Sequence, residues 1–323
     1  MHIGLLTVVF YHLPFEEALD RIAAAGLDTI ELATGNYPGN THCDPDRLLK
    51  DRDLLVAFQH QLERRALRVS AFACHGNPLH PQPAIASEHH RVFEQTVRLA
   101  SLFGVDRITL FSGCPGASDS ATSPNWVTCA WPPEFLELLE WQWREKVIPY
   151  WRDQAAFARQ HGVTRLCFEM HPGFVVYNPA TLMRLRDQVG ETIGANFDPS
   201  HLFWQGIDVI EAVRLLGRAG AIFHVHAKDT AINAGVVRQN GVLDTTPLDR
   251  VADRAWIFRT VGYGHDALFW RQFISSLREV GYDDVMSIEH EDALASPEEG
   301  VTRAVEFLLG SVLKEPPAPA WWA

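Results

Sequence analysis

Four apolar segments in the second half of the chain each end in a residue that can bind a metal ion. The segments are RLCFE, IGANFD, AIFHVH and VMSIE, and they end at Glu169, Asp198, His226 and Glu289. If they are successive parallel strands of a barrel, their carboxyl ends meet at one mouth, where such barrels hold their catalytic residues. Three carboxylates and one imidazole form a mainly hard oxygen set, which suits Mn²⁺, Mg²⁺ or Co²⁺. The sequence therefore predicts one divalent metal site, with Mn²⁺ as the expected ion.

Strands and helices that would position these residues alternate along the whole chain. Eight segments have the apolar character of short buried strands: HIGLLTV, TIEL, RVSAFAC, DRITLF, RLCFE, IGANFD, AIFHVH and VMSIE. Helical periodicity is found between them, for example over 45–66 and over 133–162, where Pro149 should bend the helix. Eight strand-helix units predict an α/β fold, a single-domain (β/α)8 TIM barrel over residues 1–314 with a tail at 315–323. The glycine-rich fingerprints of nucleotide-binding folds are absent.

Two segments depart from this regular pattern. Residues 229–265 are far longer than an ordinary strand-to-helix loop, and they are either a lid over the mouth or a flexible insert. We favour the lid, because the segment follows a strand that ends in a predicted ligand. The tail contains Trp321 and Trp322, which a partner subunit or a groove on the barrel could receive, although a disordered tail is equally compatible with its composition.

The composition limits the classes of partner. The net charge is −12, so nucleic acid and anionic membranes would be repelled, and a small sugar is the expected ligand. The five cysteines are scattered and form no C-x-x-C pair, which is typical of a reducing compartment. The apolar N-terminal segment has neither a basic leader nor a cleavage site of the signal-peptide type. We therefore expect a cytoplasmic protein, and we expect it to form a homo-oligomer.

Several motifs together resemble a known family. FEMHPG, NFDPSHLFWQGID, HVHAKD, GYGHD and SIEHED are similar to the sugar phosphate isomerase/epimerase family of the xylose isomerase-like TIM barrel superfamily. The resemblance covers nearly the whole chain and implies that Glu169, Asp198, His226 and Glu289 hold the metal. His226 is preferred to His224 because it lies nearer the end of its strand, whereas His224 would lie deeper in the barrel.

Further residues near the expected mouth are candidates for substrate binding. The resemblance implies that His201 contacts substrate oxygens, although it could instead orient a ligand. His171 shares the face of Glu169, with substrate contact and support of a ligand equally compatible with its position. Lys228 either contacts the substrate or forms a local ion pair with Asp229. The remaining candidates are His75 at the end of the third strand, and Arg259 and His265, which could alternatively pin the lid.

The resemblance and the ligand set together predict enolisation chemistry. A divalent ion that polarises a ketone would favour an enediolate, and Glu169 and Glu289 would act both as ligands and as bases. We expect a metal-dependent epimerase or isomerase of a keto-sugar or, because the 226–289 span is long, of a 3-keto-glycoside. The alternatives are a lyase or dehydratase acting on a related keto-sugar or C-glycoside, an endonuclease IV-like phosphodiesterase with extra ligands such as His42 and His75, and a non-catalytic sugar-binding barrel.

Overall fold

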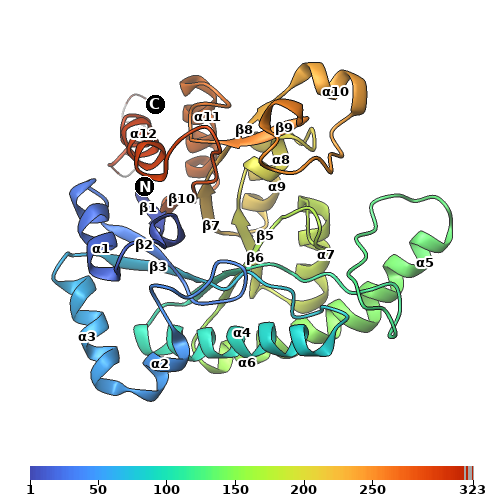
Figure 1. Cartoon of the computed structure of the whole chain (residues 1–323), viewed down its shortest axis with the longest axis horizontal. Helices are drawn as coiled ribbons and strands as arrows, with labels where there is room; N and C mark the ends of the chain where they lie inside the picture. The colour runs from blue at the N-terminus through green and yellow to red at the C-terminus, as the bar shows by residue number, and fades with distance from the viewer. Residues whose placement is uncertain (316–317, 319–321, 323) are drawn as a thin grey trace.

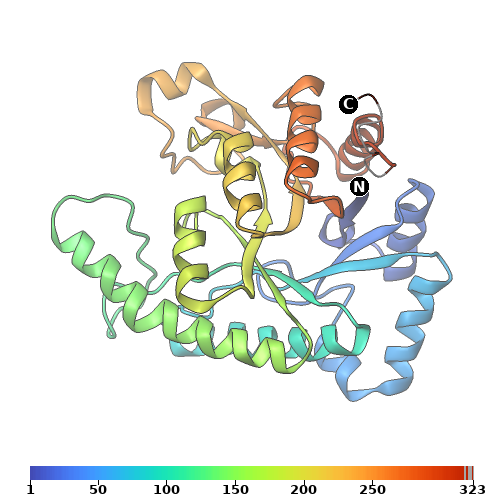
Figure 2. The ribbon, with the colours of Figure 1, turned by 180° about the vertical axis from the view of Figure 1, so that it is seen from behind.

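The computed structural model describes residues 1–315, 318 and 322, and in this range eight parallel strands close into a barrel (Figures 1 and 2). The strands follow one another around the barrel in the order β1-β10-β7-β6-β5-β4-β3-β2. They are β1 (His2–Leu6), β2 (Thr29–Ala33), β3 (Arg68–Ala73), β4 (Arg107–Leu110), β5 (Arg165–Glu169), β6 (Ile193–Phe197), β7 (Ile222–Ala227) and β10 (Val285–Ile288). Each lies in a segment predicted to be a strand, and the predicted TIM barrel is confirmed.

Helices connect the strands and surround the barrel (Figure 1). They are α1 (Phe15–Ala24), α2 (Pro45–Lys50), α3 (Arg52–Glu63), α4 (Pro83–Phe103), α5 (Glu134–Trp141), α6 (Ile148–Gln160), α7 (Pro179–Val189), α8 (Ser200–Phe203), α9 (Val209–Arg218), α11 (Ala267–Glu279) and α12 (Pro297–Leu309), together with the short 3-10 turn η1 (Thr7–Phe10). Side chains that accept hydrogen bonds from backbone amides begin several of them: Asp208 precedes α9, Asp266 precedes α11 and Ser296 precedes α12. These caps fix the points at which the loops of the mouth end.

Two of the predicted helices are interrupted. The segment 45–66 forms α2 and α3, because Asp51 adopts an extended conformation and its side chain accepts a hydrogen bond from the amide of Leu54. The segment 133–162 forms α5, a π-helical turn η2 (Gln142–Val147) and α6, and the π turn ends just before Pro149. Proline lacks the amide that would continue an α-helical ladder, so a widened turn precedes it. α5 and the loop before it extend away from the barrel (Figures 1 and 2).

The long segment between β7 and α11 has regular structure of its own. An antiparallel ribbon is formed by β8 (Asp229–Ile232) and β9 (Trp256–Arg259), and α10 (Ala234–Asn240) and a 3-10 turn, η3 (Val251–Asp253), lie between them. Trp256 stacks on Trp204, which follows α8, with 4.6 Å between the ring centroids. The ribbon is therefore packed against the loop that follows β6, at the carboxyl end of the barrel (Figure 1).

The core lies inside the barrel and between the barrel and its helices. Trp143, Trp151 and Trp270 are among the largest fully buried side chains.

The amino terminus is held by an ion pair: the amino group of Met1 pairs with Asp283 at 2.9 Å, so the first residue is tied to the loop before β10. Trp321 lies outside the described residues, and Trp322 is 73% exposed. No helix in the described residues has the length and apolar character needed to cross a membrane.

Candidate active site

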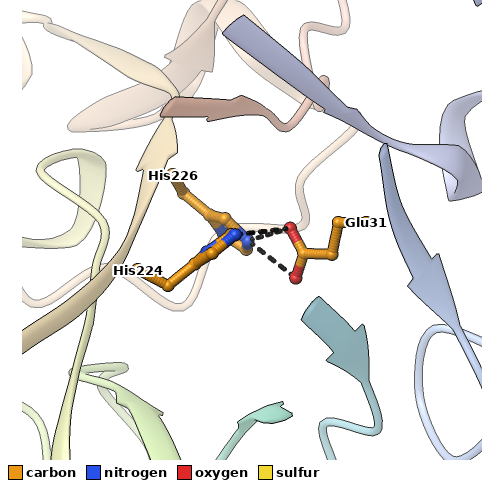
Figure 3. A group of neighbouring side chains, drawn as sticks. All are labelled: Glu31, His224 and His226. Atoms are coloured by element: carbon orange, nitrogen blue, oxygen red, sulfur yellow. Dashed lines mark hydrogen bonds and ion pairs between the residues drawn. The ribbon is translucent and has the colours of Figure 1, made fainter. Parts of the chain in front are cut away.

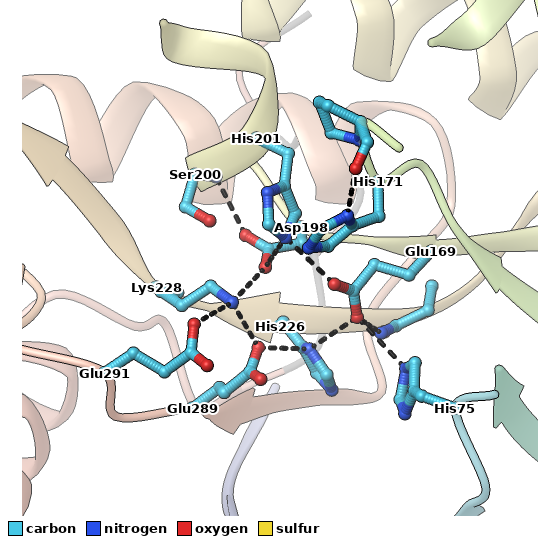
Figure 4. A network of polar contacts seen from close by, with 12 residues as sticks. His75, Glu169, His171, Asp198, Ser200, His201, His226, Lys228, Glu289 and Glu291 are labelled. Atoms are coloured by element: carbon cyan, nitrogen blue, oxygen red, sulfur yellow. Dashed lines mark hydrogen bonds and ion pairs between the residues drawn. The ribbon is translucent and has the colours of Figure 1, made fainter. Parts of the chain in front are cut away.

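The four predicted metal ligands meet at the carboxyl ends of four strands that are neighbours in the barrel (Figure 4). Glu169 ends β5, Asp198 follows β6, His226 lies in β7 and Glu289 follows β10. Each side chain offers one ligand atom, and these atoms all lie within 4.8 Å of one another. Three of the four are at most 2% exposed, whereas the side chain of Glu289 is 18% exposed. The cluster is therefore buried and is open to solvent on the side of Glu289.

Two polar atoms in this cluster lack the hydrogen bonds that buried polar atoms normally make. They are Oδ2 of Asp198 and Nδ1 of His226. Nδ1 of His226 lies 2.9 Å from Oε2 of Glu289 and 3.3 Å from Oε2 of Glu169, but no hydrogen bond of acceptable geometry joins them. Two ligand atoms that share an ion at roughly 2.1 Å are themselves about 3.0–3.4 Å apart. The spacing and the donor types fit a divalent metal ion.

The charges of neighbouring side chains shift the pKa values of two predicted ligands, Glu169 and His226. Burial alone would favour the neutral acid at Glu169, but the neighbouring His201, His226 and His75 hold its pKa well below the ordinary value. Burial also disfavours the charged form of His226, yet the carboxylates of Glu31 and Glu289 outweigh it and hold the pKa of His226 well above its ordinary value. Glu169 is thus ionised and able to act as a ligand, while a metal that binds His226 must displace a proton.

Glu31 on β2 is a site residue that the sequence analysis did not identify (Figure 3). It is fully buried, and its carboxylate oxygens lie 3.0 and 3.2 Å from Nε2 of His226. Burial opposes its charge, but His226 and His224 lower its pKa to about 2. Because Nε2 of His226 is held by Glu31, Nδ1 is directed toward the other ligands, an arrangement that orients histidine in many metal sites. The one signal in the sequence is a glutamate inside the apolar segment TIELA.

Lys228 lies among the predicted ligands rather than beside Asp229. Its side chain is 2% exposed, and Nζ lies 3.1 Å from Oδ2 of Asp198, 2.8 Å from Oε2 of Glu289 and 3.0 Å from Oε2 of Glu291. Burial would lower the pKa of Lys228, but these carboxylates hold it well above the ordinary value. The ammonium group therefore supplies positive charge to the cluster, and Glu291 was not anticipated as its partner.

Three further histidines surround Glu169. His75 Nε2 lies 3.1 Å from Oε2 of Glu169, and His201 Nε2 lies 3.0 Å from Oε1. His171 has its ring centroid 4.2 Å from that of His201, and Nδ1 of His171 is 2.6 Å from the carbonyl oxygen of Pro172. Burial and the neighbouring His201 lower the pKa of His171 to about 3, so its ring is neutral. All three lie beside the predicted metal ligand Glu169, and their contact with substrate stays a prediction.

Arg259 and His265 make contacts that fix the long segment in place. Arg259 Nε pairs with Asp292 at 3.0 Å, and His265 Nδ1 lies 2.7 Å from Oδ1 of Asp229. Asp229 Oδ2 also accepts hydrogen bonds from the amides of Gly262, Gly264 and His265. A Cβ atom on Gly264 would lie 2.3 Å from the carbonyl oxygen of Thr230, so the GYGHD motif needs glycine there. The motif closes this segment onto Asp229 at the start of β8. A role of Arg259 and His265 in substrate binding stays a prediction.

One aromatic residue of β9 lies against the site. The ring of Phe258 is 4.7 Å from Nζ of Lys228, and its centroid is 5.3 Å from that of His201. A cavity of about 100 Å³ beside it is lined by Leu248, Arg254, Ile257, Phe258, Glu291 and Ala293. The segment 229–265 thus contributes an apolar wall next to the predicted ligands.

Comparisons with known proteins identify the fold and the family. The chain is 39% identical to the uncharacterized protein YfiH of Bacillus subtilis (strain 168) over 310 residues, which cover 95% of this chain and 98% of YfiH. Three solved structures share the fold over nearly their whole length. A probable 3-DHS dehydratase, AsbF from Bacillus anthracis, has 17% identity and a TM-score of 0.66, with coverage of 96% of this chain and 99% of AsbF.

The other two structures are named for an epimerase and for a protein with bound zinc. A D-tagatose 3-epimerase-like protein has 17% identity and a TM-score of 0.64, with coverage of 96% of this chain and 98% of its own. An IOLI protein described with a binding zinc atom has 18% identity and a TM-score of 0.64, with coverage of 97% and 98%. A family model matches residues 19–310, and on that match the chain belongs to the family of xylose isomerase-like TIM barrels.

Proposed function

We propose that the protein is a divalent-metal-dependent epimerase or isomerase that acts on a keto-sugar or a 3-keto-glycoside. The observation that carries the proposal is that Glu169 and Glu289 approach the same atom from two different strands. Their Oε2 atoms lie 3.3 and 2.9 Å from Nδ1 of His226. Two carboxylates on either side of one cation-binding position can serve the two faces of a small substrate held between them.

The metal would be held by Glu169, Asp198, His226 and Glu289. Three oxygen donors and one nitrogen donor suit Mn²⁺, and Mg²⁺ or Co²⁺ would fit the same set. When bound, the ion supplies Lewis-acid polarisation of the substrate carbonyl. Support comes from the unbonded Asp198 Oδ2 and His226 Nδ1, which are buried polar atoms with no hydrogen bond.

The proton transfers would be carried out by the two glutamates. One carboxylate removes the proton from the carbon beside the ketone, and the electron pair of the C–H bond moves toward the carbonyl oxygen to give an enediolate. The other glutamate takes up a proton from solvent and delivers it to the opposite face of that carbon, which gives the epimer, while the first glutamate releases its proton to solvent. Return of the proton to the adjacent carbon gives the isomer instead. Glu289 is the better placed to take the proton, because it is the more exposed of the two.

Substrate oxygens would be bound by the polar groups around the metal. His171, His201, His75 and Lys228 all lie within this cluster (Figure 4). The wall formed by Phe258 supports a ligand larger than a free ketose, and a 3-keto-glycoside has a second group to place there. Arg259 and His265 are proposed as outer contacts of that second group.

A dehydratase is the second candidate. It would begin with the same proton abstraction and then expel a hydroxyl group from the β carbon, which requires an acid. The ammonium group of Lys228, 2.8 Å from Oε2 of Glu289, is such an acid. A phosphodiesterase of the endonuclease IV type is less well supported, because the chain is strongly acidic and Nε2 of His42 is engaged by the carbonyl oxygen of Leu13.

Proton exchange in D₂O tests the proposal. The protein is depleted of metal, loaded with Mn²⁺ and incubated with a panel of keto-sugars and 3-keto-glycosides, and C–H signals are followed by NMR. We expect one carbon-bound proton next to the ketone to exchange, to stop exchanging with a chelator and to resume when Mn²⁺ is restored. Inversion at that carbon indicates an epimerase, transfer to its neighbour an isomerase, and release of water a dehydratase.

A matched control separates site chemistry from nonspecific catalysis. Glu63→Gln on α3 removes an exposed carboxylate from the outer ring of the barrel, and its side chain is 71% exposed. This variant should exchange protons at the wild-type rate. Absence of exchange across the panel with metal demonstrably bound would reject enolisation by this protein.

A further inference from the structure

Three polar side chains form a row across neighbouring strands of the barrel. Glu169 on β5 is the register partner of Asn196 on β6, and Asn196 is the register partner of His224 on β7. Asn196 and His224 are fully buried, and Glu169 is 2% exposed. The side chain of His224 points into the barrel interior (Figure 3). Neither Asn196 nor His224 has a role in the function proposed above.

The charge of Glu169 determines how the amide of Asn196 is oriented. Nδ2 of Asn196 donates a hydrogen bond to Oε2 of Glu169 at 3.0 Å. The opposite orientation would place the amide oxygen against the carboxylate oxygen, and neither atom could donate a hydrogen bond to the other. Because both side chains are buried, two acceptors would then face each other without solvent. Asn196 therefore directs its Oδ1 away from Glu169.

The orientation of Asn196 in turn selects the tautomer of His224. Oδ1 of Asn196 lies 2.9 Å from Nδ1 of His224 and can only accept a hydrogen bond, so Nδ1 carries the proton. Nε2 of His224 lies 4.0 Å from Oε2 of Glu31, beyond hydrogen-bond distance, and 3.4 Å from Oγ of Ser70. This spacing is expected if Nε2 has a lone pair, since a protonated Nε2 would be attracted to the buried carboxylate of Glu31.

The lone pair on Nε2 of His224 leaves Glu31 free to pair with His226. Oε1 of Glu31 accepts a hydrogen bond from Thr109 at 2.6 Å, and the two oxygens lie 3.2 and 3.0 Å from Nε2 of His226. A second N–H donor on His224 would compete for these oxygens. His224 thus supports Asn196 through Nδ1 and does not disturb the pair of Glu31 and His226 (Figure 3).

We propose that Asn196 and His224 are positioning residues for Glu169, with His224 held as the tautomer that carries its proton on Nδ1. The hydrogen bond from Asn196 fixes Oε2 of Glu169, the oxygen that lies 3.3 Å from Nδ1 of His226. A carboxylate that binds a cation and moves a proton loses efficiency when it can rotate, because only one orientation is then productive. The effect on turnover rests on the proposed function, whereas the tautomer and the orientation of Glu169 do not.

The tautomer of His224 can be observed without any substrate. Protein labelled with ¹⁵N at histidine, metal-free or loaded with diamagnetic Mg²⁺, is examined by long-range ¹H–¹⁵N correlation, and the signal lost in His224→Asn identifies His224. We expect the proton on Nδ1 in the wild type and on Nε2 in Asn196→Leu, because leucine cannot accept the hydrogen bond. Ser276→Ala is the matched control: it removes a buried hydroxyl on α11 and should leave the tautomer unchanged.

Metal affinity and kinetics measure the consequence for Glu169. Competition with a coloured chelator gives the affinity for Mn²⁺, and proton exchange at saturating Mn²⁺ gives kcat and KM for the ketone of the panel that exchanges fastest. In Asn196→Leu, the affinity and kcat should each fall by roughly 10–100-fold, the usual effect of removing a hydrogen bond from a metal ligand. KM should stay close to that of the wild type, because Asn196 is not expected to touch the substrate. Ser276→Ala should match the wild type in all three quantities.

Two substitutions of His224 separate hydrogen bonding from packing. Asparagine can place an amide N–H near the position of Nδ1, whereas leucine fills more of the volume of the imidazole but has no donor. We therefore expect His224→Asn to retain a higher Mn²⁺ affinity and a higher kcat than His224→Leu. A role in packing alone predicts the reverse order, because asparagine leaves the larger cavity.

The tautomer and the affinity decide this inference independently of turnover. It is overturned if His224 carries its proton on Nε2 in the wild type, or if Asn196→Leu keeps the tautomer, the Mn²⁺ affinity or the kcat of the wild type. A wild type that binds Mn²⁺ but exchanges no proton would reject the proposed function instead. The tautomer and the Mn²⁺ affinity would then still confirm or overturn the positioning role, so the two failures are distinguishable.

Discussion

The two ends of the barrel both hold clusters of charged side chains, but only at the amino-terminal end does each named carboxylate pair with arginines. At the amino-terminal end, Arg107 pairs with Asp284 at 2.6 Å and with Asp106 at 3.3 Å. Arg68 reaches Asp284 at 3.1 Å and Arg165 reaches Asp106 at 3.5 Å. At the mouth, carboxylates outnumber the lysine and arginine groups that pair with them in the described part of the chain.

This difference distinguishes a cluster of charges that stabilises the fold from a cluster whose charges are suited to binding a cation. Cavity size alone would suggest a ligand site at the amino-terminal end. A cavity of about 420 Å³ lined by Arg68, Asp106 and Arg107 lies there, whereas the cavity beside Phe258 at the mouth has a volume of about 100 Å³. The amino-terminal charges, however, are satisfied by one another, and this end of such barrels serves stability. The mouth keeps an excess of carboxylates and two polar atoms without a hydrogen bond, which is the arrangement that our proposal of a bound cation explains.

The strongest test of this comparison is Glu289→Gln at the mouth. The amide cannot serve as an anionic ligand or as a base, so turnover should fall by at least ~100-fold and metal binding should weaken. Because the change also removes one charge from a crowded cluster, the metal-free protein should keep its free energy of unfolding within about 1 kcal/mol. Exchange kinetics, metal titration and urea unfolding measure the three quantities. Full activity in the variant would remove Glu289 from the mechanism.

Glu31→Gln tests whether the mouth is organised beyond its direct ligands. The glutamine keeps the size of the side chain but gives up the charge that holds Nε2 of His226, so metal affinity should fall about 10–100-fold. The four ligands themselves remain. A competition titration with a coloured chelator measures the affinity, with Glu63→Gln as the control. Unchanged affinity would show that Glu31 does not position His226.

Asp284→Asn tests the amino-terminal end and should have the opposite profile. It leaves Arg107, whose side chain is only 10% exposed, without its closest carboxylate. Breaking a fully buried pair costs ~3–5 kcal/mol, but Asp284 is 32% exposed and solvent screens part of the loss, so we expect about 2 kcal/mol. Urea unfolding measures this change. Metal stoichiometry and proton exchange should match the wild type, and a variant that lost metal without losing stability would contradict the division between the two ends.

Much of the fold and four of the site residues could be predicted because their signals are local. Each strand is a short apolar segment, and a ligand-type residue at its end needs no knowledge of its neighbours. Parallel strands then bring Glu169, Asp198, His226 and Glu289 to one edge without further information. The break between α2 and α3 depends instead on the local conformation of Asp51, which hydrophobic periodicity does not report.

Glu31 and the ion-pair partners of Lys228 were not predicted, because these contacts exist only in the closed barrel. Glu31 meets His226 across the interior, since β1 and β10 lie between β2 and β7 in the strand order. A glutamate in TIELA carries no local sign of that partner. For Lys228, the sequence suggested Asp229 as an ion-pair partner, but in the structure Lys228 pairs with Asp198, Glu289 and Glu291. Asp229 instead accepts hydrogen bonds from backbone amides of the GYGHD motif. Sequence adjacency was misleading because the two side chains leave the chain in opposite directions around the end of a strand.

Acid sensitivity provides the finest comparison of the two ends. Burial disfavours the charge on Asp284, but Arg107 and Arg68 outweigh burial and lower its pKa below the usual value. Such a carboxyl group has a lower pKa in the folded than in the unfolded protein, and its charge therefore stabilises the fold. This stabilisation is complete above the unfolded pKa of about 3.9 and is lost as the pH falls through the folded pKa. The free-energy difference between the wild type and Asp284→Asn should therefore be constant above about pH 5 and should shrink below about pH 4.

Measuring the difference between the two proteins, in the presence of a chelator, isolates this group. The mouth carboxylates also take up protons in acid, but they are common to both proteins and cancel. The expected change is smaller than the ~2 kcal/mol total effect of Asp284→Asn, since only part of the transition lies within the range where the barrel stays folded. A difference that stays constant down to pH 3, or that grows in acid, would show that the charge of Asp284 does not stabilise the amino-terminal end. The pairing of carboxylates with arginines would then fail as the criterion that distinguishes this end from the mouth.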